Sequence, residues 1–466
     1  MKKFTPYLIC SVLALFGSTS LFAQKRYFDN ISLNIKVTSN VSWGTSTDYQ
    51  GKPFNLNLDM YEIDGDTAQK RPVILLAHEG GFTTLSGDKT DNEVVDFAVR
   101  MARKGYVVLA FNYRIGWNFG ILNTPEQNAR QIIPALWRAM QDGKRLVRLI
   151  RETATTYRFD PERIVGAGMG AGAFIFLHTE HIDTPADYAL PSVSQKDANG
   201  NPTSKSYIDT MAMGGFADKI YSGNTAYSYR TNVVVSMCGA IGDTNFFKIG
   251  QNTPIIAVHG DRDNTTPYKS DYVYALGLYQ IVPVSGGYDM ANVMYRLGPN
   301  QIFKDVTNDG CRKTILYSKG LYSFYGKRYQ PYDATHSNNT DYTAQPISAQ
   351  NAALNMDTTV AYVTARIFKV LFESPVVTGL ESTSLKGTEV QLYPNPANDF
   401  VSIRMPQTDA KGFDIELYNI QGQRVFSQSN IVDNNYKLYK GANASGVYTL
   451  KITSAGQVQL RKLIFE

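Results

Sequence analysis

A glycine-rich stretch, RIVGAGMGAGAF from Arg163 to Phe174, constrains the fold of this chain more than any other segment. A short apolar strand ending at Val165 runs into closely spaced glycines and alanines, and another apolar run reaches Leu177. Glycine adopts backbone conformations that other residues avoid, so this spacing indicates a strand, a sharp turn and a helix in immediate succession. The rest of the chain must then supply a sheet around that strand.

The segments on either side have the pattern of such a sheet. Strands alternating with helices are typical of an α/β fold, with a doubly wound and mostly parallel sheet joined by right-handed crossovers. Continuous apolar runs predict buried parallel strands. The expected strands are 72–77, 106–114, 164–165, 232–239, 254–260 and 313–320, preceded by strand-rich edge structure over 30–64; the expected helices are 93–103, 124–157 (which Gly143 could divide) and 349–372.

Composition divides the chain further. Residues 180–228 are polar and turn-rich, which predicts an irregular insertion or lid over the carboxyl edge of the sheet, where open α/β sheets bind ligands. A Ser/Thr/Gly-rich linker is expected at 373–389. Beyond it, residues 390–466 hold short strands separated by Gln-Gly and Ala-Gly turns, which predict a small all-β sandwich domain. The α/β domain is expected to occupy 24–372.

The first 23 residues have the features of a signal peptide. A basic start is followed by a mostly apolar run, and Leu21-Phe22-Ala23-Gln24 resembles a cleavage site after Ala23. Losing Lys2 and Lys3 would lower the formal charge from +5 to +3, which is near neutral and, without a basic block, argues against nucleic acid as a partner. We therefore expect an exported protein that does not span the membrane.

Two further sets of residues carry weaker signals. Cys238 and Cys311 remain after processing, and the sequence leaves open whether they pair or stay as buried thiols. His178-Thr179-Glu180-His181 groups two imidazoles with a carboxylate, but the spacing differs from H-E-x-x-H and no third ligand is evident. We interpret the segment as a solvated helix end. No cofactor or metal is expected.

The tail resembles the type A C-terminal sorting domain of the type IX secretion system of Bacteroidota. The resemblance covers 390–466 and rests on YPNP at 393–396, LYNIQG at 417–422, SGVY at 445–448 and the final KLI at 462–464. It implies export across the outer membrane by that secretion machinery, followed by release or attachment at the cell surface.

The middle of the chain, about 35–372, resembles an α/β-hydrolase of the carboxylesterase and lipase type. Four motifs occur in the expected order: HEGGF at 78–82, FDPERI at 159–164, HGDRD at 259–263 with Pro267-Tyr268, and DATHS at 333–337. In this family they correspond to the oxyanion loop, the approach to the nucleophile elbow, the acid loop and the general-base loop.

The resemblance assigns the site residue by residue. His336 is the expected base, and Asp263 is the carboxylate that orients it. The elbow frame G-x-S-x-G corresponds to 168–172, where the serine position is occupied by Gly170, which has no nucleophilic side chain. The oxyanion loop is expected to comprise Glu79, Gly80, Gly81 and Ala171, with Glu79 in place of a glycine. A carboxylate beside a developing oxyanion would oppose it, unless Glu79 points into solvent.

These residues leave three hypotheses. The first is a secreted, surface-associated pseudo-hydrolase that binds a surface protein or a small-molecule ligand without cleaving it. The second is an active esterase in which His336 and Asp263 activate water, or in which Ser86 or Ser236 acts as a displaced nucleophile. The third is a docking component of the secretion or gliding machinery. His259 is expected to support the turn before Asp263.

Overall fold

The computed structural model forms two compact units by contact, one comprising 1–247 and 253–371 and the other 248–252 and 372–466. Each unit is described by itself below. The structure describes residues 25–84, 87–117, 120, 122–182, 193–196, 202–205, 207–215, 223–248, 253–307, 309–328, 330–334, 347–373, 390–405, 412–419, 424–454 and 457–465. The predicted signal peptide and most of the predicted linker lie outside these residues.

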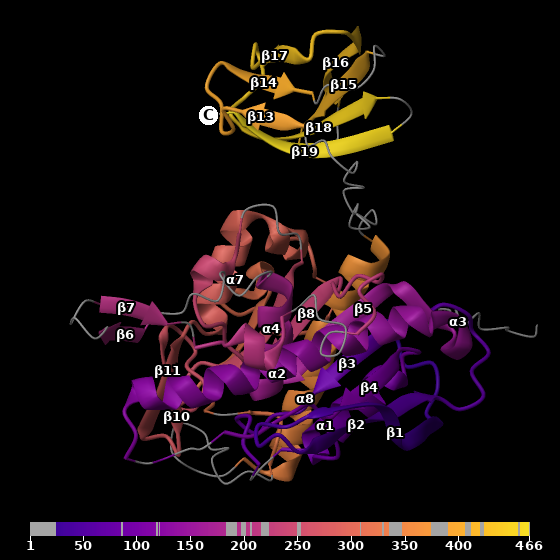
Figure 1. The fold of residues 1–466 in the computed structure, drawn as a ribbon. Helices are drawn as coiled ribbons and strands as arrows, with labels where there is room; N and C mark the ends of the chain where they lie inside the picture. The colour runs from indigo at the N-terminus through magenta and orange to yellow at the C-terminus, as the bar shows by residue number, and fades with distance from the viewer. Residues whose placement is uncertain are drawn as a thin grey trace, which may run out of the picture. The chain divides into compact units, whose positions relative to one another are not determined.

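An eight-stranded sheet forms the centre of the first unit (Figure 1). Its order is β1-β2-β4-β3-β5-β8-β9-β12, and every neighbouring pair from β4 to β12 is parallel. β3, β4, β8 and β9 are buried along their whole length, as their apolar runs predict. The strands are β1 (Ile35–Thr47), β2 (Pro53–Ile63), β3 (Arg71–Ala77), β4 (Val107–Phe111), β5 (Phe159–Met169), β8 (Val233–Met237), β9 (Ile255–Gly260) and β12 (Leu321–Phe324).

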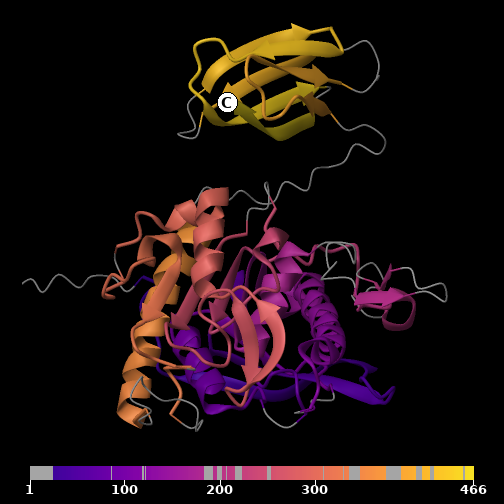
Figure 2. The ribbon, with the colours of Figure 1, turned by 90° about the vertical axis from the view of Figure 1, so that its left-hand side faces the viewer.

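Helices cover both faces of this sheet, and Figure 2 shows α2 and α8 on opposite sides of it. α1 packs against α8, and α2 packs against α4. The α-helices are α1 (Asn92–Ala102), α2 (Pro125–Glu152), α3 (Ala154–Tyr157), α4 (Ala171–His181), α5 (Thr210–Met213), α7 (Gly287–Leu297) and α8 (Ala349–Phe368). Shorter helical turns are η1 (Thr244–Phe246), η2 (Pro299–Phe303), η3 (Tyr317–Lys319) and η4 (Lys369–Glu373).

Two hairpins lie outside the main sheet. β10 (Asp271–Ala275) pairs with β11 (Tyr279–Val284), and β6 (Val193–Lys196) pairs with β7 (Pro202–Lys205). The sequence pattern did not indicate β10, β11 or α7. Within the predicted insertion at 180–228, the structure describes β6, β7, α5 and parts of their connections, and the rest lies outside the described residues.

Two expectations about element boundaries are wrong. α2 runs through Gly143 without a break. The glycine allows α4 to approach α2 closely, since a Cβ at this position would lie 2.9 Å from Ile175 Cγ2. The expected strand at 313–320 is displaced. Its residues end in the turn η3, and the next segment, Leu321–Phe324, forms β12 by pairing with β9.

The edge strand β1 is long and irregular. It pairs with β2 on one side only, and its register shifts between Thr38 and Val41 and again between Ser42 and Gly44. Such shifts are β-bulges, which bend a strand and increase its twist.

A buried ion pair holds α2 against the end of β4. Both side chains are at most 2% exposed, and Arg114 Nη2 lies 2.9 Å from Asp142 Oδ1. The Arg114 backbone N–H also donates to Asp142 Oδ2 at 2.8 Å. We expect Asp142→Asn to lower the free energy of unfolding by about 3–5 kcal/mol, because it leaves a buried guanidinium without its counter-charge. Urea unfolding followed by tryptophan fluorescence measures this loss.

The control is Glu126→Gln on the same helix. Glu126 pairs with Arg130 at 2.9 Å, but these side chains are 56% and 36% exposed. Exposed pairs contribute less than about 1 kcal/mol. A similar loss of unfolding free energy in Asp142→Asn and Glu126→Gln would contradict a stabilising role for the buried Arg114–Asp142 pair.

The second unit is a sandwich of two antiparallel sheets, as predicted for a small all-β domain. Their orders are β13-β14-β17 and β16-β15-β18-β19. The apolar side chains between them form a separate core that includes Val401, Leu417 and Leu450. The strands are β13 (Gln391–Tyr393), β14 (Phe400–Arg404), β15 (Phe413–Tyr418), β16 (Arg424–Ile431), β17 (Asn435–Tyr439), β18 (Gly446–Ser454) and β19 (Gln457–Phe465).

Candidate active site

The elbow predicted from the glycine-rich stretch is present between β5 and α4. β5 ends at Met169, α4 begins at Ala171, and Gly170 between them has φ 48° and ψ −118°. Few non-glycine residues adopt such a positive φ without strain. The Gly170 N–H donates to Met237 O at 2.9 Å, which ties the turn to the end of β8.

Packing requires the two outer glycines of this elbow. A Cβ on Gly168 would lie 2.2 Å from the carbonyl carbon of Gly172, and one on Gly172 would lie 2.3 Å from Ala77 O. These neighbours are backbone atoms, which cannot rotate away. The outer glycines of the G-x-G-x-G spacing are therefore required by the close approach of α4 to β3 and β5, and this requirement does not depend on the residue at position 170.

A pocket with an empty volume of about 660 Å³, counted with its open mouth, lies over Gly170. Most of the lining side chains are aliphatic or aromatic, and Thr265, Thr266 and His178 add polar groups. The lining comprises Gly81, Phe82, Ile132, Ile133, Leu136, Gly170, Ala171, Phe174, His178, Gly242, Thr265, Thr266, Val273, Val282 and Val284.

His178 is held in a fixed, neutral state at this pocket. Its Nδ1–H donates to Phe174 O at 2.7 Å, and its Nε2 accepts from the Gly242 N–H at 3.0 Å. Burial lowers the pKa of His178 to about 4. The imidazole is therefore uncharged at neutral pH and positions the loop after β8.

The interpretation of 178–181 as a solvated helix end is wrong, because all four residues are at most 1% exposed. They do not converge on a metal either. Glu180 Oε1 accepts from the Thr231 N–H at 2.8 Å, while His178 binds Gly242. Side chains that look solvated in the sequence are buried here because the following segments supply their partners.

The loop after β3, residues 78–82, forms one wall of the pocket and is called the pocket loop. Gly81 and Phe82 line the pocket and have positive φ values of 60° and 58°. Trp117 Nε1–H donates to Gly81 O at 2.8 Å, and the Gly116 N–H donates to Phe82 O at 2.8 Å. Gly81 and Ala171, two residues of the expected oxyanion loop, both line the pocket.

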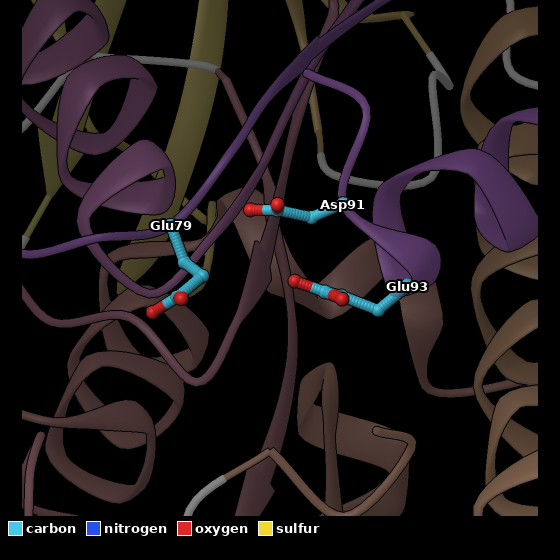
Figure 3. Close-up of side chains that lie close together, drawn as sticks. All are labelled: Glu79, Asp91 and Glu93. Carbon is cyan, nitrogen blue, oxygen red and sulfur yellow. The ribbon is translucent and has the colours of Figure 1, made fainter. Parts of the chain in front are cut away.

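Glu79 takes neither of the orientations considered from the sequence. It is only 5% exposed, so it does not point into solvent, and it does not line the pocket. Its carboxylate lies within 4.8 Å of carboxylate oxygens of Asp91 and Glu93 (Figure 3). The expected repulsion between Glu79 and an oxyanion therefore does not arise from direct contact in the pocket.

Asp263 lies on the turn after β9, beside the pocket residues Thr265 and Thr266. Its Oδ1 accepts from the N–H groups of Thr265 and Thr266 at 2.8 and 3.0 Å. Its side chain is fully buried, and Oδ2 has no hydrogen-bond partner among the described residues. His259 Nε2 lies 3.3 Å from Oδ2 but donates to Thr266 O at 3.0 Å, so His259 supports this turn as expected.

The expected base, His336, lies outside the described residues, as does Ser86. In chain order the pocket loop, the elbow, Asp263 and His336 come after β3, β5, β9 and β12 in turn. These strands are parallel, and the loops after their carboxyl ends meet at one edge of the sheet.

The other alternative nucleophile, Ser236, lies in the core. It is 1% exposed, does not line the pocket, and sits on β8 opposite Gly168. A Cβ on Gly239 would lie 2.7 Å from its Oγ, so the hydroxyl is enclosed by the protein. Cys238 and Cys311 are both free, so the disulfide left open by the sequence does not form.

The sequence analysis missed Asp91 and Glu93. They lie at the start of α1 and meet Glu79 from the pocket loop. The only signal in the sequence is the acidic run DNE at 91–93, which is also an ordinary feature of helix N-termini.

Two segments of the chain match protein-family models. Residues 58–275 match the family model BD-FAE, an esterase-like α/β-hydrolase family, and this segment includes the pocket loop, the elbow and Asp263. Residues 391–466 match the family model described as "Secretion system C-terminal sorting domain". A comparison with curated proteins gives no match.

Solved structures with similar folds include bacterial esterases. Native esterase 2 of Thermogutta terrifontis is 15% identical, with a TM-score of 0.38, covering 76% of this chain and 98% of that one. A truncated carbohydrate esterase from gut microbiota is 14% identical, with a TM-score of 0.37, covering 71% and 96%. Likeness at this level says nothing about activity.

The observed topology and the two family matches agree. No helix among the described residues has both the length and the apolar character needed to cross a bilayer. The chain joins a domain with an α/β-hydrolase fold to a C-terminal β-sandwich that matches the sorting-domain model, and that match indicates export across the outer membrane.

Proposed function

We propose that this protein is a secreted, surface-associated pseudo-hydrolase that binds a ligand with an apolar acyl group in the pocket over Gly170 and forms no acyl-enzyme. The observation that carries the proposal is the glycine at the centre of the elbow. Covalent hydrolysis needs a side-chain nucleophile there, and removing the serine of a well-studied protease lowers its turnover by about a million-fold. The buried position of Ser236 supports the same conclusion.

The pocket's lining favours an acyl group as the ligand. Aliphatic side chains such as Ile133, Val273 and Val282 surround the space, and the backbone at Gly81 and Ala171 borders it. An apolar chain would be buried against the side chains. A carboxylic acid or ester group at its end would meet the first-turn N–H groups of α4, which lack partners within the helix.

Two measurements on the mature protein test this function. A fluorophosphonate probe, which reacts with activated serines, is expected to leave the protein unlabelled. Octanoate is expected to bind in isothermal titration, and Val273→Trp is expected to weaken that binding at least ten-fold by filling the pocket. Covalent labelling of the wild-type chain would overturn the pseudo-hydrolase proposal.

The control for the pocket is Tyr272→Trp. Tyr272 lies on the same strand, β10, but does not line the pocket. We expect its octanoate affinity to match the wild type within about two-fold. Equal weakening by both variants, or no octanoate binding by the wild type, would contradict the assignment of the pocket as an acyl site.

One observation favours the esterase alternative. Asp263 Oδ2 is buried without a hydrogen-bond partner among the described residues, which suits a carboxylate that orients an imidazole. In that alternative His336 would act as general base toward water. Turnover of p-nitrophenyl acetate that disappears in His336→Ala would establish it, whereas absence of turnover above the His336→Ala background supports binding alone.

A further inference from the structure

An acidic cluster that includes one residue of the pocket loop lies outside the lining of the pocket. It comprises Glu79 on that loop and Asp91 and Glu93 at the start of α1, which extend toward Glu79 in Figure 3. Glu79 and Glu93 are 5% and 3% exposed, and Asp91 is partly buried. One oxygen from each carboxylate lies within 4.8 Å of the other two. Carboxylates this close repel one another unless a proton or a cation lies between them.

Glu93 provides a second observation. Both of its carboxylate oxygens are buried, and neither has a hydrogen-bond partner among the described residues. A buried carboxylate normally accepts several hydrogen bonds, because its desolvation is costly. Glu93 lies in the first turn of α1, where N–H groups could bind it, yet it extends toward Asp91 and Glu79 instead.

The charged groups that act on Glu93 are acidic. Burial, together with the charges of Asp333, Glu79 and Asp91, raises the pKa of Glu93 to about 8. The nearest lysine in sequence, Lys89, is engaged elsewhere, because its Nζ lies 2.8 Å from Asp59. Asp91 has one hydrogen bond from the Asp88 N–H at 2.8 Å. The Glu93 carboxyl group therefore meets the carboxylates of Asp91 and Glu79 without a hydrogen-bond donor of its own among the described residues.

We infer that Glu79, Asp91 and Glu93 bind a calcium ion, which links the pocket loop to the start of α1. Calcium takes oxygen ligands at about 2.3–2.6 Å, so two ligands of one ion lie at most about 5 Å apart, and these three oxygens satisfy that limit. The ion would neutralise the cluster and complete its shell with water and backbone oxygens. An exported protein meets calcium at the concentrations that weak extracellular sites require.

Binding would matter for the pocket without touching the ligand. Glu79 is followed directly by Gly80 and Gly81, and Gly81 lines the pocket. Holding the Glu79 side chain would fix the backbone of that loop relative to α1. This inference does not rest on the proposed acyl ligand, and its failure would leave that proposal untouched.

The experiment titrates CaCl₂ into the chelator-treated full-length chain by isothermal titration, with a thermal melt beside it. We expect one ion per chain with a Kd on the order of 0.1–1 mM, the range of extracellular calcium modules. Calcium at 10 mM is expected to raise the melting temperature by several degrees, because the ion binds only the folded state. Absence of binding up to 10 mM would overturn the site.

Glu93→Gln and Asp91→Asn are the test variants, and Asp96→Asn is the matched control. Asp96 also lies on α1, and Asp96→Asn removes the same charge as the test variants. Asp96 pairs with Arg100 and does not belong to the cluster. We expect both test variants to lose at least ten-fold in calcium affinity, and the control to lose less than two-fold. Without calcium, Glu93→Gln should melt no lower than the wild type, since it replaces a buried carboxyl group that has no hydrogen-bond partner among the described residues. Equal affinity in all variants would overturn the assignment of ligands.

Discussion

Gly172→Ala is expected to destabilise the hydrolase domain by about 3 kcal/mol or more. The added Cβ would lie 2.3 Å from Ala77 O and 2.5 Å from His78 O. Both are backbone atoms at the end of β3, so α4 would have to move away from the sheet. Urea unfolding followed by tryptophan fluorescence measures the effect.

That signal reports the right unit, because all three tryptophans, Trp43, Trp117 and Trp137, belong to the first one. The matched control is Gly215→Ala, where an added Cβ meets no atom within 4 Å and φ is not positive. We expect it to change stability by less than about 0.5 kcal/mol. If Gly172→Ala were equally mild, the close approach of α4 to β3 would not be what requires this glycine.

Gly170→Ser is expected to convert the unlabelled protein into one that reacts with a fluorophosphonate. The elbow already has the backbone conformation that presents a serine, with φ 48° and ψ −118°. Adding the hydroxyl should raise the labelling rate at least a hundred-fold over the wild type. A serine hydroxyl is a weak nucleophile by itself and becomes a strong one when an adjacent general base takes its proton. Gel fluorescence after a fixed incubation measures the gain.

Two further variants separate chemistry from folding. Gly170→Ala carries a side chain at the same positive φ, so both substitutions should cost about 1–3 kcal/mol of stability, while only the serine is labelled. His336→Ala added to Gly170→Ser should abolish the labelling if that histidine serves as base. A folded Gly170→Ser chain that stays unlabelled would mean that the other groups are not arranged for catalysis.

Local patterns in the sequence were sufficient to predict most of the sheet and its main helices. β3 and β8 are continuous apolar runs, and a strand buried on both faces requires them. The elbow was also predictable from its local sequence. Gly168 and Gly172 are required by close backbone contacts, so they mark the turn even where no nucleophile is present.

The displaced last strand shows where local patterns fail. Residues 313–320 and Leu321–Phe324 are both apolar enough to form a strand, and the choice depends on which one pairs with β9. Leu321 lies opposite Ala257, a contact between segments 64 residues apart in the chain. Gly320, at φ 89°, forms the turn that precedes Leu321, and the sequence alone does not predict where this turn ends and β12 begins.

The site was less predictable than the fold because side-chain direction depends on distant partners. The sequence places Glu79 in the pocket loop but does not show that it meets Asp91 and Glu93, twelve or more residues away. Likewise, His178 is buried because Gly242, from the loop after β8, donates to it. Spacing within a motif carries no information about such contacts.

The irregular edge strand β1 has a consequence for association between copies of the chain. A straight exposed strand offers unpaired N–H and C=O groups on which another sheet can grow. The two register shifts in β1 interrupt that row, and charged Lys36 lies on the strand as well. In an exported protein, these two features protect the long open edge of the sheet from edge-to-edge aggregation.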